Sequence, residues 1–378
     1  MSAPLNTENT ALHNLIEIAN QFETPGMVLK VEEFGHGNIN GTFLVSLDSV
    51  AEKHFILQRI NQNVFRQPEL VMQNMSTFSN HVCQRLKDTP LNSNRRWEVP
   101  KVLLTHNNQT HFIDTENSFW RGIGFIANAE TFDTIKDKQH ASEVGYALGM
   151  FHNLISDLPP HKLADTLPGF HVTPSYLKQY ENIAREYNNS SQSAEVEYCW
   201  QFINNRKTWA HVLENARAQG HLRLRPIHGD PKVNNVMIDT GNGEAISIID
   251  LDTVKPGLVH YDIGDCLRSG CNPLGEETED WERVSFDTDI CQLLLGGYLS
   301  VASSFLTESD YLYIYDGIRL IAFELGLRFF TDYLAGNVYF KVKYPEHNLA
   351  RALVQFKLTE SIETQEDAIR RVISSFDN

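Results

Sequence analysis

The residues with the clearest chemical potential lie in residues 227–235, which read IHGDPKVNN, and at position 250, fifteen residues after that run ends. Asp230 supplies a carboxylate, Lys232 an ammonium group, Asn235 an amide and Asp250 a second carboxylate. A site for phosphoryl transfer has to orient a hydroxyl, hold a metal ion and neutralise charge on phosphate oxygens, with little covalent chemistry of its own. These residue types at this spacing therefore indicate phosphoryl transfer.

Each of the four groups suits one part of that chemistry. Asp230 is the predicted catalytic base that accepts the hydroxyl proton, and Lys232 is predicted to contact the moving phosphoryl group. Mg²⁺ takes only one or two protein oxygens besides phosphates and water, so Asn235 and Asp250 are the predicted metal ligands. The alternative is that Asp230 is a turn or cap residue in an ordinary loop, but four matched positions together disfavour it.

A β-hairpin is expected to bring the two predicted metal ligands together. The apolar residues 236–238 and 246–249 flank Gly241-Asn242-Gly243, a turn sequence typical of hairpins. Asn235 and Asp250 stand at the two open ends of this hairpin. A pair that is distant in sequence is thus predicted to be close in space.

These residues resemble those of the aminoglycoside-phosphotransferase-like branch of the protein-kinase-like superfamily, whose members phosphorylate aminoglycosides, choline and sugars. The C-terminal runs GLRFFTDYL (326–334) and NVYFKVKYPEHNL (337–349) look like those of bacterial N-acetylhexosamine 1-kinases, as does Ile249-Asp250-Leu251-Asp252-Thr253 with Pro256-Gly257 behind it. The likeness covers most of residues 28–350, and the C-terminal runs are its specific part.

The resemblance implies a bilobal α+β fold of the protein-kinase type. A small antiparallel β-sheet would form the nucleotide-binding N-lobe in residues 1–127. A larger, mainly helical C-lobe in residues 128–378 would carry the catalytic loop, the metal site and the substrate pocket. The implied ligands are ATP, Mg²⁺ and a small-molecule acceptor.

A glycine-rich segment lies between the first two of three expected strands, at about residues 28–34, 42–47 and 53–59. It reads GHGNING over residues 35–41, and Gly35, Gly37 and Asn38 are its predicted nucleotide contacts. Glycines let backbone N–H groups approach phosphates closely. The same residues also build plain hairpin turns, so this assignment leans on the downstream run.

The third expected strand departs from the protein-kinase pattern. Protein kinases carry an ATP-contacting lysine there, whereas this strand has Gln58, as do the sugar kinases that it resembles. Arg59 is expected on the opposite strand face. The cation that replaces the lysine is left open by the sequence.

Three further strands are expected at residues 97–104, 110–114 and 119–126. Phe125 and Ile126 fall where the two lobes of a kinase-like fold join, and their backbone would pair with adenine. The alternative is a simple strand end followed by a loop.

Helical patterns dominate from residue 139 onward, with long apolar helices expected at residues 286–305, 311–334 and 348–373. His152 lies on an apolar face and is interpreted as a core histidine. In the family that the chain resembles, an acid at this place braces the catalytic loop, which implies Asp262 or Asp265; the alternative is that either of them, Asp265 in particular, is a helix N-cap.

Arg328 is a cation in a strongly apolar run, so it needs a partner or a cleft. An ion pair with Glu324 or Asp332 at helical spacing is one solution. The family likeness implies another, in which Arg328 and Tyr339 contact the sugar beside Asp230.

Composition limits the remaining choices. The chain has 378 residues, is 42% hydrophobic and 21% charged, and carries a net charge of −16, which disfavours a nucleic-acid partner. No export signal or run of about eighteen apolar residues is evident, so a cytoplasmic location with no membrane contact is expected. The five cysteines are odd in number and lack a C-x-x-C pair, so reduced thiols are expected. A monomer or small homo-oligomer is expected.

Three functions follow from these observations. The first is Mg-ATP-dependent phosphorylation of the anomeric hydroxyl of N-acetylglucosamine or N-acetylgalactosamine. The second keeps the phosphate chemistry with another acceptor, such as a hexose, choline or another amino alcohol, or an aminoglycoside. The third is a nucleotide-binding pseudokinase, which the absent strand lysine favours and the intact set of Asp230, Asn235 and Asp250 opposes.

Overall fold

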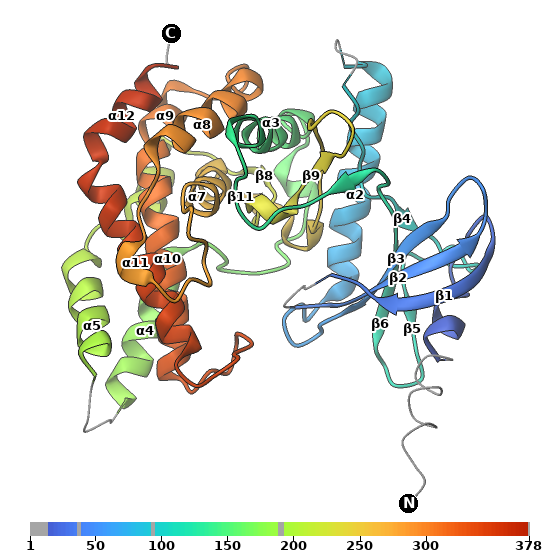
Figure 1. The fold of residues 1–378 in the computed structure, drawn as a ribbon, viewed down its shortest axis with the longest axis horizontal. Helices are drawn as coiled ribbons and strands as arrows, with labels where there is room; N and C mark the ends of the chain where they lie inside the picture. The colour runs from blue at the N-terminus through green and yellow to red at the C-terminus, as the bar shows by residue number, and fades with distance from the viewer. Residues whose placement is uncertain (1–13, 36–38, 92–94, 188–192, 377–378) are drawn as a thin grey trace, which may run out of the picture. The chain divides into compact units, whose positions relative to one another are not determined.

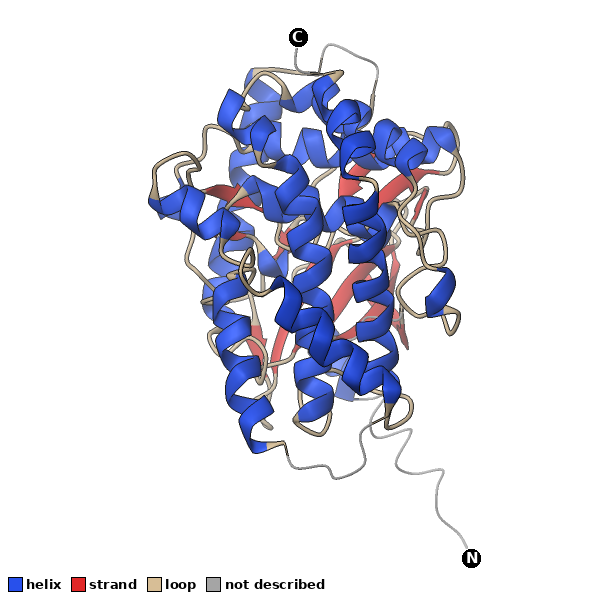
Figure 2. Ribbon diagram, turned by 90° about the vertical axis from the view of Figure 1, so that its left-hand side faces the viewer, coloured by secondary structure: helices blue, strands red, loops and turns tan. Residues whose placement is uncertain are grey.

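The structure is a computed structural model that describes residues 14–35, 39–91, 95–187 and 193–376. It divides into two compact units, Met1–Pro90 with Glu98–Asn128, and Leu91–Trp97 with Ala129–Asn378. The first unit carries an antiparallel sheet (Figure 1), and the second is mainly helical (Figure 2). The predicted α+β fold class is confirmed.

The sheet of the first unit is built from antiparallel neighbours in the order β1-β2-β3-β6-β4, with β5 pairing β6 outside that path. Its strands are β1 (Met27–Glu33), β2 (Gly41–Asp48), β3 (His54–Ile60), β4 (Val102–Leu103), β5 (Phe112–Ile113) and β6 (Phe119–Gly124). The first three agree closely with the expected strands. The paired parts of β4 and β5 are much shorter than the expected 97–104 and 110–114, because only two residues of each pair with β6.

Alternation along β2 and β3 gives this sheet two different faces. Val45, Phe55 and Leu57 are buried with Ile18 and Ala19 from the N-terminal helical segment 14–19. The intervening residues of these strands point to the opposite face. Helix α2 (Pro68–Asp88) also belongs to this unit and begins with a proline at its first turn, a position that suits proline.

Short strands in the second unit frame the predicted catalytic run. Two sheets contain them: β10-β9-β7 and β11-β8. Their strands are β7 (Ala129–Glu130), β8 (Arg225–Ile227), β9 (Val236–Asp239), β10 (Ala245–Ile248) and β11 (Lys255–Gly257). The predicted hairpin is confirmed, since β9 and β10 pair antiparallel around the turn at residues 240–244.

Helices make up most of the second unit, and α10 packs along both α7 and α11 (Figure 1). The helices are α3 (Lys138–Leu154), α4 (Thr173–Glu186), α5 (Ala194–Arg206), α6 (Val212–Ala218), α7 (Val259–Gly270), α8 (Thr288–Ala302), α9 (Glu308–Leu312), α10 (Ile314–Leu334), α11 (His347–Thr364) and α12 (Glu366–Ser374). One aromatic-rich core lies among α4, α5, α10 and α11, and includes Phe202, Phe323, Phe330 and Phe356.

Two of the expected long helices are interrupted. The expected helix 311–334 begins in α9 and restarts as α10 after Tyr313, and the expected helix 348–373 breaks at Gln365 between α11 and α12. At the first break, Leu312 before it is exposed and Ile314 after it is buried, and beyond the second break α12 buries Ile369 and Ile373. All five cysteines are free thiols, and no helix in the described part of the chain is long and apolar enough to span a membrane.

Candidate active site

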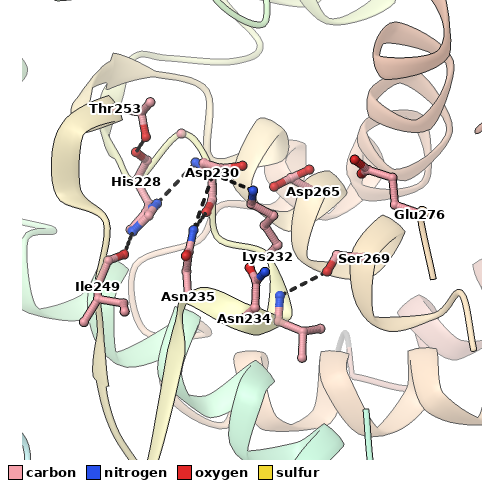
Figure 3. Close-up of polar contacts among 12 residues, drawn as sticks. His228, Asp230, Lys232, Asn234, Asn235, Ile249, Thr253, Asp265, Ser269 and Glu276 are labelled. Atoms are coloured by element: carbon pink, nitrogen blue, oxygen red, sulfur yellow. Dashed lines mark hydrogen bonds and ion pairs between the residues drawn. The ribbon is translucent and has the colours of Figure 1, made fainter. Parts of the chain in front are cut away.

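The predicted catalytic residues lie in the loop that leaves β8 and enters the β9–β10 hairpin (Figure 3). Gly229 turns this loop with a φ of +90°, in the left-handed region that favours glycine. A Cβ at this position would lie 2.8 Å from the carbonyl oxygen of Thr253 and 2.9 Å from its Cβ. Any residue other than glycine would therefore be strained at position 229, both by its backbone conformation and by its contact with Thr253.

His228 links the two predicted acidic residues of the site through both nitrogens of its ring. Its Nδ1 accepts the backbone N–H of Asp230 at 3.2 Å, and its Nε2 donates to the carbonyl of Ile249 at 2.9 Å, next to Asp250. These partners require the neutral ring that is protonated on Nε2. Burial also lowers the pKa of His228, which favours the same neutral form.

Asp262 on α7 holds the loop from the other side. Its carboxylate accepts the backbone N–H of His228 at 2.7 Å, the N–H of Gly229 at 2.8 Å and the Nε2 proton of His152 at 2.9 Å. Asp262 is therefore the bracing acid, and His152 is a hydrogen-bonded core residue, as expected. The N-cap alternative for Asp265 is wrong, because Asp265 lies inside α7, whose N-cap is Leu258.

Asp230 and Lys232 form an ion pair at 3.2 Å between Oδ2 and Nζ, with 30% and 37% of their side chains exposed. Burial raises the pKa of Asp230 above its ordinary value, and the charge of Lys232 opposes this rise. The charge of Asp230 in turn raises the pKa of Lys232, which stays an ammonium group. A carboxylate whose pKa is shifted toward neutrality is a stronger base than an ordinary one.

The two predicted metal ligands lie at the open end of the hairpin. The backbone N–H of Ile249 donates to the carbonyl of Asn235 at 2.9 Å, which places Asp250 beside Asn235. The side-chain amide of Asn235 donates to the backbone carbonyl of Asp230 at 2.7 Å, so its oxygen faces away, and none of the described residues donates to it. Asp250 is exposed and has a left-handed φ of +63°. An amide oxygen and an exposed carboxylate are a donor set that fits Mg²⁺.

A second histidine reaches the catalytic loop from a distant part of the chain. Nε2 of His171 donates to the carbonyl of Gly229 at 2.7 Å, and Nδ1 lies 2.9 Å from the carboxylate of Glu324 on α10. Both ring nitrogens thus face acceptors, which suits the doubly protonated ring. Burial lowers the pKa of His171, but the charge and hydrogen bond of Glu324 raise it more, so the net shift is upward.

This raised pKa predicts a stability term that depends on pH. Because the folded-state pKa of His171 exceeds about 6.5, its stabilisation is fully present below about pH 6.5 and is lost as the pH rises through the folded-state value. We expect Glu324→Gln to lower the unfolding free energy at pH 6 more than at pH 9, in urea titrations. Thr173→Val, which removes the 2.6 Å hydrogen bond to Glu324 without a titrating group, should give a loss that is independent of pH. An equal loss at both pH values for Glu324→Gln would contradict the prediction.

Arg328 is half-buried on α10, where its guanidinium carbon lies 5.2 Å, 5.0 Å and 5.4 Å from the ring centres of Phe170, Tyr176 and Phe340. No ion pair among the described residues joins it to a carboxylate of α10, so that alternative is wrong. Burial lowers the pKa of Arg328, but the surrounding negative groups raise it overall, and Asp230 is one of them. Phe170, which lies beside Arg328, has its ring 4.0 Å from that of His171, and His171 donates to the loop that carries the predicted base.

Tyr339 is half-exposed in the segment that follows α10. Asp332 fixes this segment, since its carboxylate accepts the backbone N–H groups of Val338, Tyr339 and Phe340 at 2.8–2.9 Å. Tyr339 also contributes to the raised pKa of Arg328, so the two side chains are close enough to interact. Arg328 and Tyr339 both lie against the ring of Phe340, at 5.4 Å from the guanidinium carbon and 4.8 Å between ring centres.

The predicted nucleotide contacts lie in the first unit. Gly35 has a φ of +74° at the start of the glycine-rich hairpin, whereas Gly37 and Asn38 lie outside the described residues. Phe125 follows the end of β6, with its ring 6.3 Å from that of Phe34. Ile126 is buried beside it in sequence.

Comparison with known proteins assigns the chain to a family. The profile of the phosphotransferase enzyme family matches residues 30–289, which is more than half of the chain and contains the whole catalytic loop and hairpin. The chain belongs to this phosphotransferase family. It is accordingly a small-molecule, ATP-dependent phosphotransferase.

Solved structures share the fold of this phosphotransferase at low sequence identity. A choline kinase from Cryptosporidium parvum Iowa II is 16% identical, with a TM-score of 0.61 over 97% of this chain and 99% of that chain. A microcompartment-associated aminopropanol kinase is 13% identical, with a TM-score of 0.61 over 95% and 98%. An aminoglycoside phosphotransferase from Alicyclobacillus acidocaldarius is 13% identical, with a TM-score of 0.55 over 100% and 97%. These proteins are named for different acceptors, so the shared fold leaves the acceptor of this phosphotransferase open.

Two further acids of the phosphotransferase site have a partner that the sequence does not reveal. Asp265 is buried on α7, pairs with Arg268 at 2.8 Å and acts electrostatically on both Asp230 and Lys232 (Figure 3). Glu276 pairs with the same arginine at 3.0 Å. In the sequence, Asp265 is an acid on an apolar background and Glu276 lies in an acidic run, and neither pattern indicates Arg268 as the partner.

Proposed function

We propose that this phosphotransferase transfers the γ-phosphoryl group of ATP to a neutral sugar, specifically to the anomeric hydroxyl of an N-acetylhexosamine. The products would be a sugar 1-phosphate and ADP. The family assignment supports the phosphoryl transfer. The environment of Arg328 is the observation that supports a neutral acceptor, and the sequence likeness of residues 326–349 supports the acetamido sugar.

In the proposed reaction, Asp230 accepts the hydrogen bond and then the proton of the attacking hydroxyl. The sugar oxygen forms a bond to the γ-phosphorus while the bond from that phosphorus to the ADP oxygen breaks. Lys232, which is held 3.2 Å from Asp230, provides positive charge beside the transferred group. An anomeric hydroxyl is more acidic than an ordinary alcohol, so a carboxylate whose pKa is already raised is an adequate base.

Asn235 and Asp250 would hold Mg²⁺ at the end of the hairpin, as their oxygens and position suggest. The ion supplies charge neutralisation for the phosphates of the nucleotide. The neutral ring of His228 fixes the Asp230 backbone relative to Ile249, which precedes Asp250. Gly35 and the backbone of Phe125 and Ile126 are the proposed contacts of the nucleotide in the first unit.

Arg328 argues against a cationic acceptor. A fixed guanidinium within reach of Asp230 repels the ammonium groups of choline, amino alcohols and aminoglycosides. Its planar donors suit hydroxyl and acetamido oxygens, and the phenol of Tyr339 adds a further polar group beside an apolar ring. Two nearby acids, Asp265 and Glu276, both form ion pairs with Arg268, so they do not reverse the preference for a neutral acceptor.

The direct test is ADP release with Mg-ATP across N-acetylglucosamine, N-acetylgalactosamine, glucose, galactose, choline, ethanolamine and kanamycin. Phosphorus NMR of the product would locate the new phosphate. We expect the acetamido sugars to give the highest kcat/KM, with phosphate on the anomeric oxygen. Turnover with an amino alcohol or aminoglycoside alone would refute the proposed acceptor and keep the phosphotransferase.

Arg328→Met is expected to raise the acceptor KM by about 10- to 100-fold, which is the loss of one or two hydrogen bonds to a charged donor. The KM for ATP should stay within about twofold, because the proposed role of Arg328 concerns the acceptor alone. Steady-state kinetics with each substrate varied in turn would measure both constants. Arg319→Met is a matched control on the same helix, since Arg319 pairs with Asp316 and stacks 4.2 Å from the Trp209 ring centre. Equal effects of the two variants would contradict the acceptor role.

A further inference from the structure

A row of three polar side chains crosses the sheet of the first unit. Thr42 on β2 lies opposite Gln58 on β3, and Gln58 lies opposite Arg121 on β6. Directly opposed residues of antiparallel strands share one face of a sheet. The row is joined by hydrogen bonds, from Nε2 of Gln58 to the Thr42 hydroxyl at 3.0 Å and from Arg121 to Oε1 of Gln58 at 2.6 Å and 2.9 Å.

Arg121 fixes which way the Gln58 amide points. A guanidinium has only donors, so the amide oxygen of Gln58 has to face Arg121 and the NH₂ group has to face Thr42. One of the two amide protons is used by Thr42. None of the described residues accepts the other proton, which lies at the half-buried end of Gln58, next to the strand start at Gly41 where the glycine-rich hairpin ends.

The guanidinium itself is enclosed. Arg121 is only 1% exposed, and its remaining terminal nitrogen lies 3.8 Å and 4.0 Å from the sulfur atoms of Met75 and Met72 on α2. Burying a guanidinium costs free energy, which hydrogen bonds or a nearby anion have to offset. Its enclosure also means that its charge acts through little water, which strengthens the field at Gln58.

We infer that Gln58 donates its free amide proton to a phosphate of the nucleotide, and that Arg121 is the positioning residue that orients this amide. The pair would thereby replace the strand lysine that protein kinases use. This inference rests on the proposed nucleotide use of the first unit. In this arrangement the hydrogen-bond donor is Gln58 on β3, and the positive charge is carried by Arg121 on β6.

Gln58→Glu is the sharpest test, because it keeps the shape of the side chain and replaces its donor by an acceptor. The new carboxylate would pair with Arg121, so the thermal midpoint should be equal or higher. Affinity for Mg-ATP, measured by titration calorimetry on the full chain, should fall by about 10- to 100-fold through the lost charged hydrogen bond. Affinity for adenosine, which has no phosphate, should be unchanged. Equal ATP affinity in wild type and variant, or parallel losses of ATP and adenosine affinity, would overturn the inference.

A charge exchange tests the role of Arg121 separately. Arg121→Met should weaken ATP binding and leave adenosine binding unchanged, and adding Gln58→Lys in that background should restore ATP binding. Arg59→Met is the matched control, since Arg59 is exposed on the opposite face, 5.8 Å from the Trp120 ring centre, and should bind ATP like the wild type. If the double variant does not recover affinity for ATP, Gln58 and Arg121 do not take the role of the strand lysine. A wild type that binds no ATP would refute the proposed nucleotide function itself, and the inference with it.

Discussion

Asp230→Asn is expected to lower kcat by about 10²- to 10⁴-fold, the usual contribution of a positioned general base. The substitution keeps the size of the side chain and removes only its ability to take a proton. The KM for ATP should change little, because Asp230 is proposed to contact the acceptor hydroxyl. ADP release under saturating substrates measures the effect.

The pH profile adds a second measure of Asp230. Because burial raises the pKa of Asp230, kcat/KM of the wild type should fall on the acid side as this carboxylate becomes protonated. Asp230→Asn should lose that acid limb together with the rate. Asp239→Asn is the matched control, since Asp239 belongs to the same hairpin but pairs with Arg96 at 3.0 Å. Activity that survives in Asp230→Asn would remove the assigned base, and a wild type inert toward every acceptor would favour a pseudokinase.

Asp262→Ala is expected to impair both stability and activity. The substitution leaves the N–H groups of His228 and Gly229 without their carboxylate, and it leaves His152 facing an empty buried site. Removing one partner of a buried charged network typically costs about 3–5 kcal/mol of unfolding free energy. The catalytic loop would also lose its position, and small displacements of reacting groups slow catalysis by about 10²-fold.

The pH dependence of Asp262 has the opposite sign to that of His171. Burial raises the pKa of Asp262, but the hydrogen bond from His152 and the one from the backbone N–H of His228 lower it more, so the folded-state value is depressed below about 3.8. Its stabilisation is therefore present above the unfolded-state pKa and is lost as the pH falls through the folded-state value. Urea unfolding of wild type and Asp262→Ala should differ most near neutral pH and converge in acid. Asp316→Ala removes an acid that pairs with Arg319 on its own helix, and it should keep normal activity.

The elements that could be predicted from sequence are those fixed by local pattern. The hairpin after Asn235 follows from two apolar runs around a glycine turn, and pairing of β9 with β10 confirms it. The sequence leaves Asp262 and Asp265 as alternatives for the bracing acid, and the hydrogen bonds from His228 and Gly229 to Asp262 decide between them. The helix ends at Tyr313 and Gln365 are not marked in the sequence, because apolar residues occur on both sides of each break.

Contacts that span long separations could not be predicted in this way. Nothing near His171 in sequence indicates that it holds the Gly229 carbonyl, and its partner Glu324 is 153 residues further along the chain. The aromatic surroundings of Arg328 come from α4, its preceding loop and the segment after α10. A single sequence contains the charge of such residues but not the fold that decides their partners.

The anchoring of residues 338–340 by Asp332 has a consequence for how acceptor choice could change during evolution. One carboxylate binds this stretch through three main-chain N–H groups, so this contact does not depend on which side chains the stretch carries. The base, by contrast, is tied through His228 to the strand that precedes Asp250. Substitutions at Val338 or Tyr339, which are exposed, could thus change the recognition of the acceptor while the phosphate chemistry stays intact.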